Sequence, residues 1–133
     1  MLKEADYNTI TQKIIGCAIE VHKELGPGLL ESVYELCLFK TMLEAGLKVE
    51  SRVALPVVFK SDVLNKDFVI DLLVENEIVV ELKSVESILP VHESQLVTYL
   101  KLSNKKLGLL INFNVQILKN GIRRKINGDL NSV

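Results

Sequence analysis

Two short apolar runs separated by three residues constrain the fold of this chain more than any other feature. Phe68–Val74 and Ile78–Ser84 are rich in Val, Ile and Leu, and the polar segment Glu75-Asn76-Glu77 lies between them. Apolar and β-branched residues in runs of this length are typical of strands. A three-residue connection joins antiparallel strands, because parallel strands need a crossover of a dozen or more residues. The sequence therefore predicts a β-hairpin here.

The register expected for this hairpin brings three charged side chains to one place. If Val74 pairs with Ile78 across the turn, Asp71 lies directly opposite Glu81. Because side chains alternate between the faces of a strand, Lys83 shares the face of Glu81. Carboxylates that face each other across a strand pair have Cβ atoms about 4.5–5.5 Å apart and repel each other. Lys83 offsets part of that charge, and a divalent cation with oxygen ligands, Mg²⁺ or Mn²⁺, would offset the rest.

The same three residues also fit a simpler interpretation, a ladder of charged side chains on a solvated face of the sheet. Such ladders are common at the surfaces of antiparallel sheets. The expected neighbours on this face, Val69, Leu73 and Val79, are all apolar. Because a solvated face normally carries polar neighbours, we favour the cation site over the ladder.

The remaining pattern predicts a mixed β-sheet flanked by helices, an α/β fold in one domain over residues 1–133. Consecutive strands are expected to pair as meanders, and a helix then crosses over to one more strand. The expected elements are helices from Asn8 to Leu25, Leu29 to Ala45 and Pro90 to Leu102, strands over Val49–Ser51, Val53–Lys60 and Lys106–Phe113, and a terminal hairpin that turns at Asn120-Gly121.

Composition narrows the classes of function. Lys and Arg number 16 against 17 Asp and Glu, whereas proteins that coat nucleic acid nonspecifically are strongly basic. Aromatic residues make up 5% of the chain, which leaves few rings to stack on bases. Cys17 and Cys37 lie in apolar helical patterns without metal or redox spacing. No signal core or membrane-length apolar run is present, so we expect a cytoplasmic protein that makes no membrane contact.

One segment resembles the motif that names the GxxExxY protein family. That motif is Gly28-Leu29-Leu30-Glu31-Ser32-Val33-Tyr34. The likeness covers nearly the whole chain, and the family is similar to a compact branch of the PD-(D/E)XK nuclease superfamily. It continues through Leu55–Val58, Asp71–Val74, Val80–Val85, Leu89–Glu93, Gln95–Leu100, Leu109–Asn114 and Gly121–Arg124.

The resemblance implies a restriction-endonuclease-like core and metal-assisted hydrolysis of phosphodiester bonds in DNA or RNA. Asp71 and Glu81 would hold Mg²⁺ or Mn²⁺ with help from the Leu82 carbonyl, and Lys83 would orient water or stabilise the phosphate. Glu31 would act as a further ligand or base. One departure is Val69, where members commonly carry Arg, and this removes a cation from the face of the site.

Several of the implied residues have structural alternatives. Glu31 is also a first-turn acid favoured by the helix dipole. Gln95 and Tyr99 lie four apart on one helix face, so they either contact substrate, steady Lys83 or simply cover the sheet. Tyr34 is either a substrate contact or a core aromatic with a polar tip. Arg123 and Arg124 either bind phosphates or protect a solvated sheet edge.

Three functional hypotheses follow. The first is a Mg²⁺-dependent nuclease. The second is a catalytically inactive module with the same fold that binds nucleic acid or a protein, favoured by the near-neutral charge, the few aromatics and Val69. The third is a homo-oligomer that uses apolar surface for self-association, which is compatible with either of the others.

Overall fold

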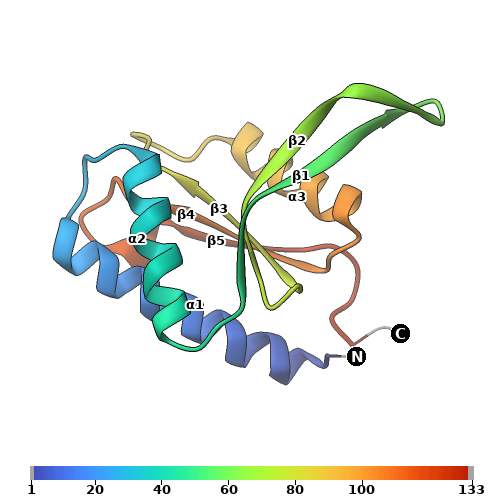
Figure 1. Cartoon of the computed structure of the whole chain (residues 1–133). Helices are drawn as coiled ribbons and strands as arrows, with labels where there is room; N and C mark the ends of the chain where they lie inside the picture. Colours follow the sequence, from blue (N-terminus) through green and yellow to red (C-terminus); the bar gives the residue numbers. More distant parts are fainter. Residues whose placement is uncertain (1, 132–133) are drawn as a thin grey trace.

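The structure, a computed structural model that describes residues 2–131, consists of three α-helices and a five-stranded sheet (Figure 1). The elements follow one another as α1 (Glu4–Leu25), α2 (Glu31–Glu44), β1 (Val49–Phe59), β2 (Asp62–Val74), β3 (Ile78–Lys83), α3 (Pro90–Ser103), β4 (Leu107–Asn112), the short 3-10 helix η1 (Leu118–Gly121) and β5 (Ile122–Ile126).

The sheet is mixed, as the sequence predicts. Its strand order is β1-β2-β3-β4-β5, in which β3 and β4 are parallel and the other neighbours are antiparallel. Helix α3 makes the crossover between the two parallel strands. The register expected for the central hairpin is confirmed, because Val74 pairs with Ile78 and Leu72 with Val80. All six residues of β4 are buried, so this strand is covered on both faces.

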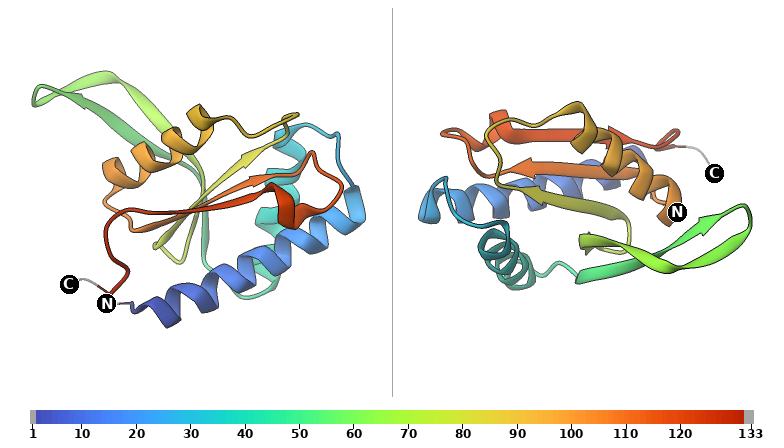
Figure 2. Two further views of the ribbon diagram at one scale, coloured as in Figure 1. Left: turned by 180° about the vertical axis from the view of Figure 1, so that it is seen from behind. Right: turned by 90° about the horizontal axis from the view of Figure 1, so that it is seen from above.

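Helices cover both faces of the sheet (Figure 2). Helices α1 and α2 pack on one face over the larger hydrophobic cluster, which includes Tyr34, Leu72 and Leu82. Helix α3 packs on the other face over a smaller cluster that includes Ile70 and Leu96. Strand β3 therefore lies between two apolar layers, and a charged side chain on it must find a partner or an opening to solvent.

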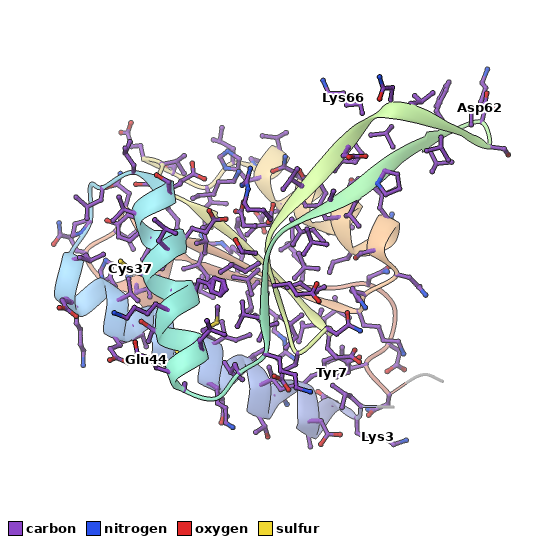
Figure 3. All side chains as sticks on the ribbon, in the orientation of Figure 1. Lys3, Tyr7, Cys37, Glu44, Asp62 and Lys66 are labelled. Carbon is purple, nitrogen blue, oxygen red and sulfur yellow. The ribbon has the colours of Figure 1, made fainter. Side chains whose placement is uncertain are left out.

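The hairpin of β1 and β2 continues beyond the sheet as a two-stranded arm, residues 55–68 (Figures 1 and 3). Its tip turns at Lys60 and Ser61, which both adopt left-handed backbone conformations, with φ of 51° and 69°. Large apolar side chains along the arm are exposed, among them Phe59 at 60% and Val63 at 71%. The sequence predicts its first strand, but Ser61-Asp62 and Asn65-Lys66 favour turns there, whereas β2 begins at Asp62.

The side chains of β2 stop alternating regularly between the two faces of the sheet at one point. Ile70 belongs to the cluster under α3, whereas Leu72 belongs to the cluster under α1 and α2. Residues two apart on a regular strand share a face, so the change marks an irregularity at Asp71. The ladder pairs Ser51 with Leu72 and Val53 with Ile70, and neither Arg52 nor Asp71 takes part between them.

Two expectations about element ends are wrong. Helix α1 begins at Glu4 rather than after Asn8, because the Asp6 carboxylate accepts a hydrogen bond from the Lys3 N–H at 2.9 Å and satisfies the first turn. Asn120-Gly121 belongs to η1 rather than to a two-residue hairpin. The reason is close packing: a Cβ at Gly121 would lie 2.3 Å from the carbonyl oxygen of Asn112.

Candidate functional site

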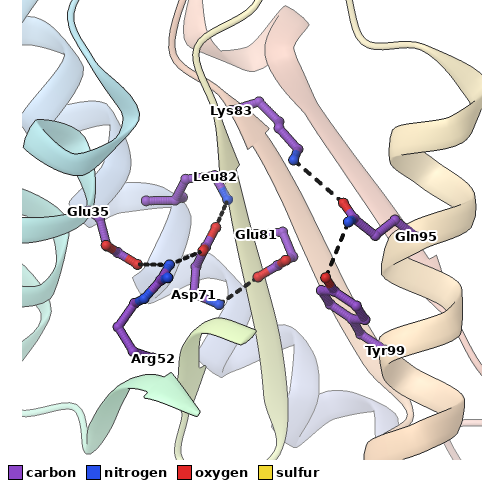
Figure 4. Close-up of polar contacts among 8 residues, drawn as sticks. All are labelled: Glu35, Arg52, Asp71, Glu81, Leu82, Lys83, Gln95 and Tyr99. Carbon is purple, nitrogen blue, oxygen red and sulfur yellow. Dashed lines mark hydrogen bonds and ion pairs between the residues drawn. The ribbon is translucent and has the colours of Figure 1, made fainter. Parts of the chain in front are cut away.

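Asp71 and Glu81 meet where β2 and β3 stop pairing (Figure 4). The Glu81 Oε2 accepts a hydrogen bond from the Asp71 backbone N–H at 2.7 Å. In return, the Asp71 Oδ2 accepts one from the Leu82 backbone N–H at 2.9 Å. Backbone pairing between the two strands ends at Leu72 and Val80. Beyond this pair, the two carboxylates accept the backbone hydrogen bonds instead.

Glu81 is the more deeply buried of the two acids. Its residue is 4% exposed, and burial, together with the nearby charge of Asp71, raises the pKa of Glu81 to about 8. The hydrogen bond from the Asp71 backbone and the charge of Lys83 act in the opposite direction but do not compensate. The protein therefore holds a carboxyl group that is costly to ionise unless another positive charge comes near it.

The expectation that both carboxylates open into one pocket needs correction. Asp71 lines a cavity of about 200 Å³ beneath α2, and Glu81 is not among the lining residues. The physical reason is the change of face at Asp71, which regular alternation along β2 does not anticipate. Besides Asp71 and the buried Leu82, the cavity is lined by Glu31, Ser32, Glu35 and Arg52.

Glu35 and Arg52 line this cavity as well, although neither was predicted from the sequence. The Arg52 NH1 lies 3.2 Å from the Asp71 Oδ1 and 3.8 Å from the Glu35 Oε1. Among the described residues, that Glu35 oxygen is the buried side-chain atom without a hydrogen-bond partner. Burial and the charge of Asp71 raise the pKa of Glu35, and the charge of Arg52 opposes the rise.

A signal for Glu35 was present in the sequence, whereas none was present for Arg52. Glu35 follows Glu31 by four residues, so both lie on one face of α2. Arg52 reaches Asp71 only because β1 pairs with β2 and its own backbone is left-handed, with φ of 58°. That conformation costs roughly 1–2 kcal/mol for a residue other than glycine.

Lys83 points to the α3 side of β3, where two residues of α3 receive it (Figure 4). Its Nζ donates to the Gln95 Oε1 at 3.5 Å, and the Gln95 Nε2 donates to the Tyr99 hydroxyl at 3.2 Å. Burial and the charges of Glu81 and Asp71 raise the pKa of Tyr99. The structure therefore brings Gln95 and Tyr99 to Lys83, which agrees with the alternative that they steady its ammonium group.

Tyr34 does not lie in the site, and the prediction of a substrate contact there is corrected. Its side chain is fully buried and stacks on Phe113, with 4.4 Å between ring centroids. The hydroxyl donates to the Gly26 carbonyl at 2.5 Å and accepts from the Leu29 N–H at 3.1 Å. Tyr34 therefore braces the loop between α1 and α2 and has no surface to offer a ligand.

Arg123 and Arg124 lie at the far edge of the sheet. They belong to β5, which is two strands away from β3 and so about 10 Å from it along the hydrogen-bonding direction. Arg123 donates to the carbonyls of Asn120 and Ile122, and Arg124 donates to the side chain of Asn8 on α1. The structure does not bring these arginines to Asp71 or Glu81.

His92 and His22 also lie outside the site. The His92 Nδ1 accepts a hydrogen bond from the backbone N–H of Leu89, the N-cap residue of α3, at 2.9 Å. The His22 Nε2 lies 2.7 Å from the Val115 carbonyl oxygen.

The oxygen donors at this end of the hairpin suit a hard divalent cation in their chemistry. Within residues 2–131, no three His, Cys, Asp or Glu residues converge as a ready-made ion site. The buried acid Glu81 and Glu35, whose Oε1 has no hydrogen-bond partner, nevertheless lie on either side of Asp71, and the pKa of each is raised. A cation would supply positive charge there, and Arg52 now occupies part of the position.

Comparison with known proteins gives one match. A family model described as the PD-(D/E)XK nuclease superfamily matches residues 8–125, a span that includes all the residues of the cavity and of the Lys83 cluster. The α/β architecture with its five-stranded mixed sheet agrees with the restriction-endonuclease-like fold of that superfamily. The search of curated proteins gave no match. The search of solved structures gave none either.

Proposed function

The chain belongs to the PD-(D/E)XK nuclease superfamily, and on that premise we propose that it is a nuclease that needs Mg²⁺ or Mn²⁺ and cleaves phosphodiester bonds in DNA or RNA. The observation that carries the proposal is that the Glu81 carboxylate accepts from the Asp71 N–H while the Asp71 carboxylate accepts from the Leu82 N–H, which places two acids side by side on a hairpin. Lys83 follows Glu81 by two residues and is held on the same strand.

In this proposal, Asp71, Glu81 and the Leu82 carbonyl would hold the cation. When bound, the cation would polarise the scissile phosphate and make a bound water more acidic. Gln95 keeps the ammonium of Lys83 near Glu81, where it can stabilise negative charge that develops on the phosphate. Glu31 lines the same cavity as Asp71 and is the candidate for a further ligand or base.

Three finer assignments accompany this proposal. The segment Gly28–Tyr34 supports membership in the GxxExxY family, and residues 1–133 are proposed to form one nuclease-like domain. The free thiols of Cys17 and Cys37 are compatible with a reducing cytoplasm. In residues 2–131, no helix combines the length and apolar character needed to cross a membrane.

The test is a nicking assay with purified protein, supercoiled plasmid and Mn²⁺. We expect Lys83→Ala to abolish nicking, because Lys83 lies beside the site. The circular dichroism spectrum and melting temperature should stay near those of the wild type, because Lys83 is only half-buried. The matched control is Lys23→Ala, which removes an exposed lysine near the end of α1. Nicking that survives Lys83→Ala would contradict the assignment and indicate a contaminating nuclease.

A second candidate is a module that kept this fold for binding and lost the chemistry. The observation in its favour is the contact of Asp71 with Arg52, which already compensates one of the two acids without a metal. Calorimetric titration with Mg²⁺ and Mn²⁺ separates the candidates. Absence of binding by a folded wild-type protein would favour the binding module.

A further inference from the structure

Building on the proposed function, we infer that Arg52 is a positioning residue that holds the carboxylates of Asp71 and Glu35 in the metal-free protein and competes with a divalent cation for the Asp71 carboxylate. Binding of the cation then requires release of the Arg52 guanidinium. Arg52 would thereby set the metal affinity of the site, a role distinct from that of the residues proposed to hold the metal.

The contacts of a single guanidinium nitrogen carry this inference. The Arg52 NH1 lies 3.2 Å from the Asp71 Oδ1 and 3.8 Å from the Glu35 Oε1, so one positive group serves two acids from different elements (Figure 4). Carboxylate oxygens of this kind are the ligands that Mg²⁺ and Mn²⁺ prefer. The guanidinium and a divalent cation would therefore compete for the Asp71 carboxylate.

The exposure of the three side chains indicates which of them can move. The side chain of Arg52 is 60% exposed, whereas those of Asp71 and Glu35 are 19% and 17% exposed. The guanidinium can swing into solvent without uncovering the core, while the carboxylates stay where the strand and helix hold them. Ion pairs of so exposed a group are weak, so a doubly charged ion can displace it.

The backbone of Arg52 shows that the contact is built into the fold. Its φ of 58° is unfavourable for arginine, and the residue drops out of the ladder between Ser51 and Val53. In a regular antiparallel strand pair, Arg52 would pair through its backbone with Asp71 at this position. Backbone strain of this kind persists where surrounding structure imposes it, often at functional positions.

The charges that line the cavity also support a role for Arg52 in metal affinity. Three acids, Glu31, Glu35 and Asp71, line it, and Arg52 is the cation among the described lining residues. The Lys83 ammonium is directed toward Gln95 on α3. Neutralising Arg52 would therefore leave an excess of negative charge at the oxygens that a cation would use.

The experiment is isothermal titration of the metal-free full chain with Mn²⁺. We expect Arg52→Gln, which keeps the backbone conformation equally unfavourable and removes only the charge, to bind Mn²⁺ about tenfold more tightly than the wild type, equivalent to about 1.4 kcal/mol. Arg52→Lys, which keeps a cation, should stay near wild-type affinity. Lys48→Gln removes a positive charge from an exposed residue just before β1 and should leave the affinity unchanged.

A second neutral variant keeps the test decisive if Arg52→Gln does not fold. Arg52→Asn also removes the charge but suits a left-handed backbone, so it remains folded if Arg52→Gln does not. Unchanged or weaker Mn²⁺ binding by a folded neutral variant would overturn the inference while leaving the proposed nuclease intact. Absence of Mn²⁺ binding by both the wild type and the neutral variants would overturn the proposed function and the inference together.

Discussion

The Glu81 carboxylate accepts a hydrogen bond from the backbone N–H of Asp71, while the Asp71 carboxylate accepts one from the N–H of Leu82. Each acid therefore satisfies a backbone donor of the strand that carries the other. Removing either side chain leaves a backbone N–H without its partner, so variants at these positions test structure as well as chemistry. Isosteric amides, which keep an acceptor oxygen, are the informative replacements.

The first prediction concerns the pH dependence of stability in the metal-free protein. The pKa of Glu81 is raised from 4.5 to about 8, so the folded state keeps a proton that the unfolded chain has already lost. Between these values the folded state binds more protons, and the free energy of unfolding should fall as the pH rises, by up to about 1.4 kcal/mol per pH unit.

Urea denaturation of wild type and Glu81→Gln in EDTA, from pH 5 to pH 9, measures this effect. Because glutamine does not titrate, the free energy of unfolding of Glu81→Gln should lack this decrease with pH. The stability of the variant relative to the wild type should therefore increase as the pH rises. Glu44→Gln, at the exposed end of α2, is the matched control and should keep the wild-type slope. Parallel slopes for wild type and Glu81→Gln would contradict the prediction.

The second prediction concerns the brace formed by Tyr34. Tyr34→Phe keeps the stacking on Phe113 but removes the hydroxyl that links the Gly26 carbonyl to the Leu29 N–H. We expect a loss of about 1–3 kcal/mol in the free energy of unfolding, because two partly buried backbone groups lose their partner. Faster amide exchange at residues 26–30 should accompany it. A change below about 0.5 kcal/mol would show that water replaces the hydroxyl without cost.

The third prediction compares two glycines. A Cβ at Gly121 would lie 2.3 Å from the Asn112 carbonyl oxygen, whereas one at Gly16 in α1 would meet nothing within 4 Å. Gly121→Ala should lower the melting temperature markedly, because the backbone atoms of Asn112 cannot move away from the added methyl group without a large energetic cost. Gly16→Ala should raise stability by about 1 kcal/mol, the difference in helix propensity. Equal effects of the two substitutions in thermal melts would contradict this packing argument.

The fourth prediction concerns Asn112, which is 1% exposed and holds the segment that follows Lys83. Its Oδ1 accepts from the Val85 N–H at 3.0 Å, and its Nδ2 donates to the Val85 carbonyl at 2.9 Å. Asn112→Ala should cost at least about 2 kcal/mol, since both backbone groups lose their partner. Chemical denaturation measures the loss.

The control for this variant is Asn65→Ala on the exposed arm, which should be nearly neutral. Amide exchange should also quicken at residues 84–89 in Asn112→Ala and stay unchanged in the control. An Asn112→Ala protein as stable as the control variant would mean that the Val85 contacts contribute little.

Local pattern was enough to predict the central hairpin and its register. The three-residue turn and the period-two pattern leave one pairing that buries apolar residues, and Val74 does pair with Ile78. The same reasoning predicted that a helix crosses over from this hairpin to one more strand, as α3 does between β3 and β4. The register predicts that Asp71 and Glu81 come near each other, but it did not predict that pairing ends at Leu72 and Val80 or that only Asp71 of the two lines the cavity.

Contacts between distant segments were decided by the tertiary structure. Arg52 reaches Asp71 because β1 lies beside β2 and its backbone leaves the regular strand conformation, which no periodicity records. Arg123 and Arg124 are kept from the site because β5 joins the sheet beyond β4. The physical reason is range: side-chain alternation and turn length act over a few residues, whereas strand order and packing depend on how the whole chain buries its apolar surface.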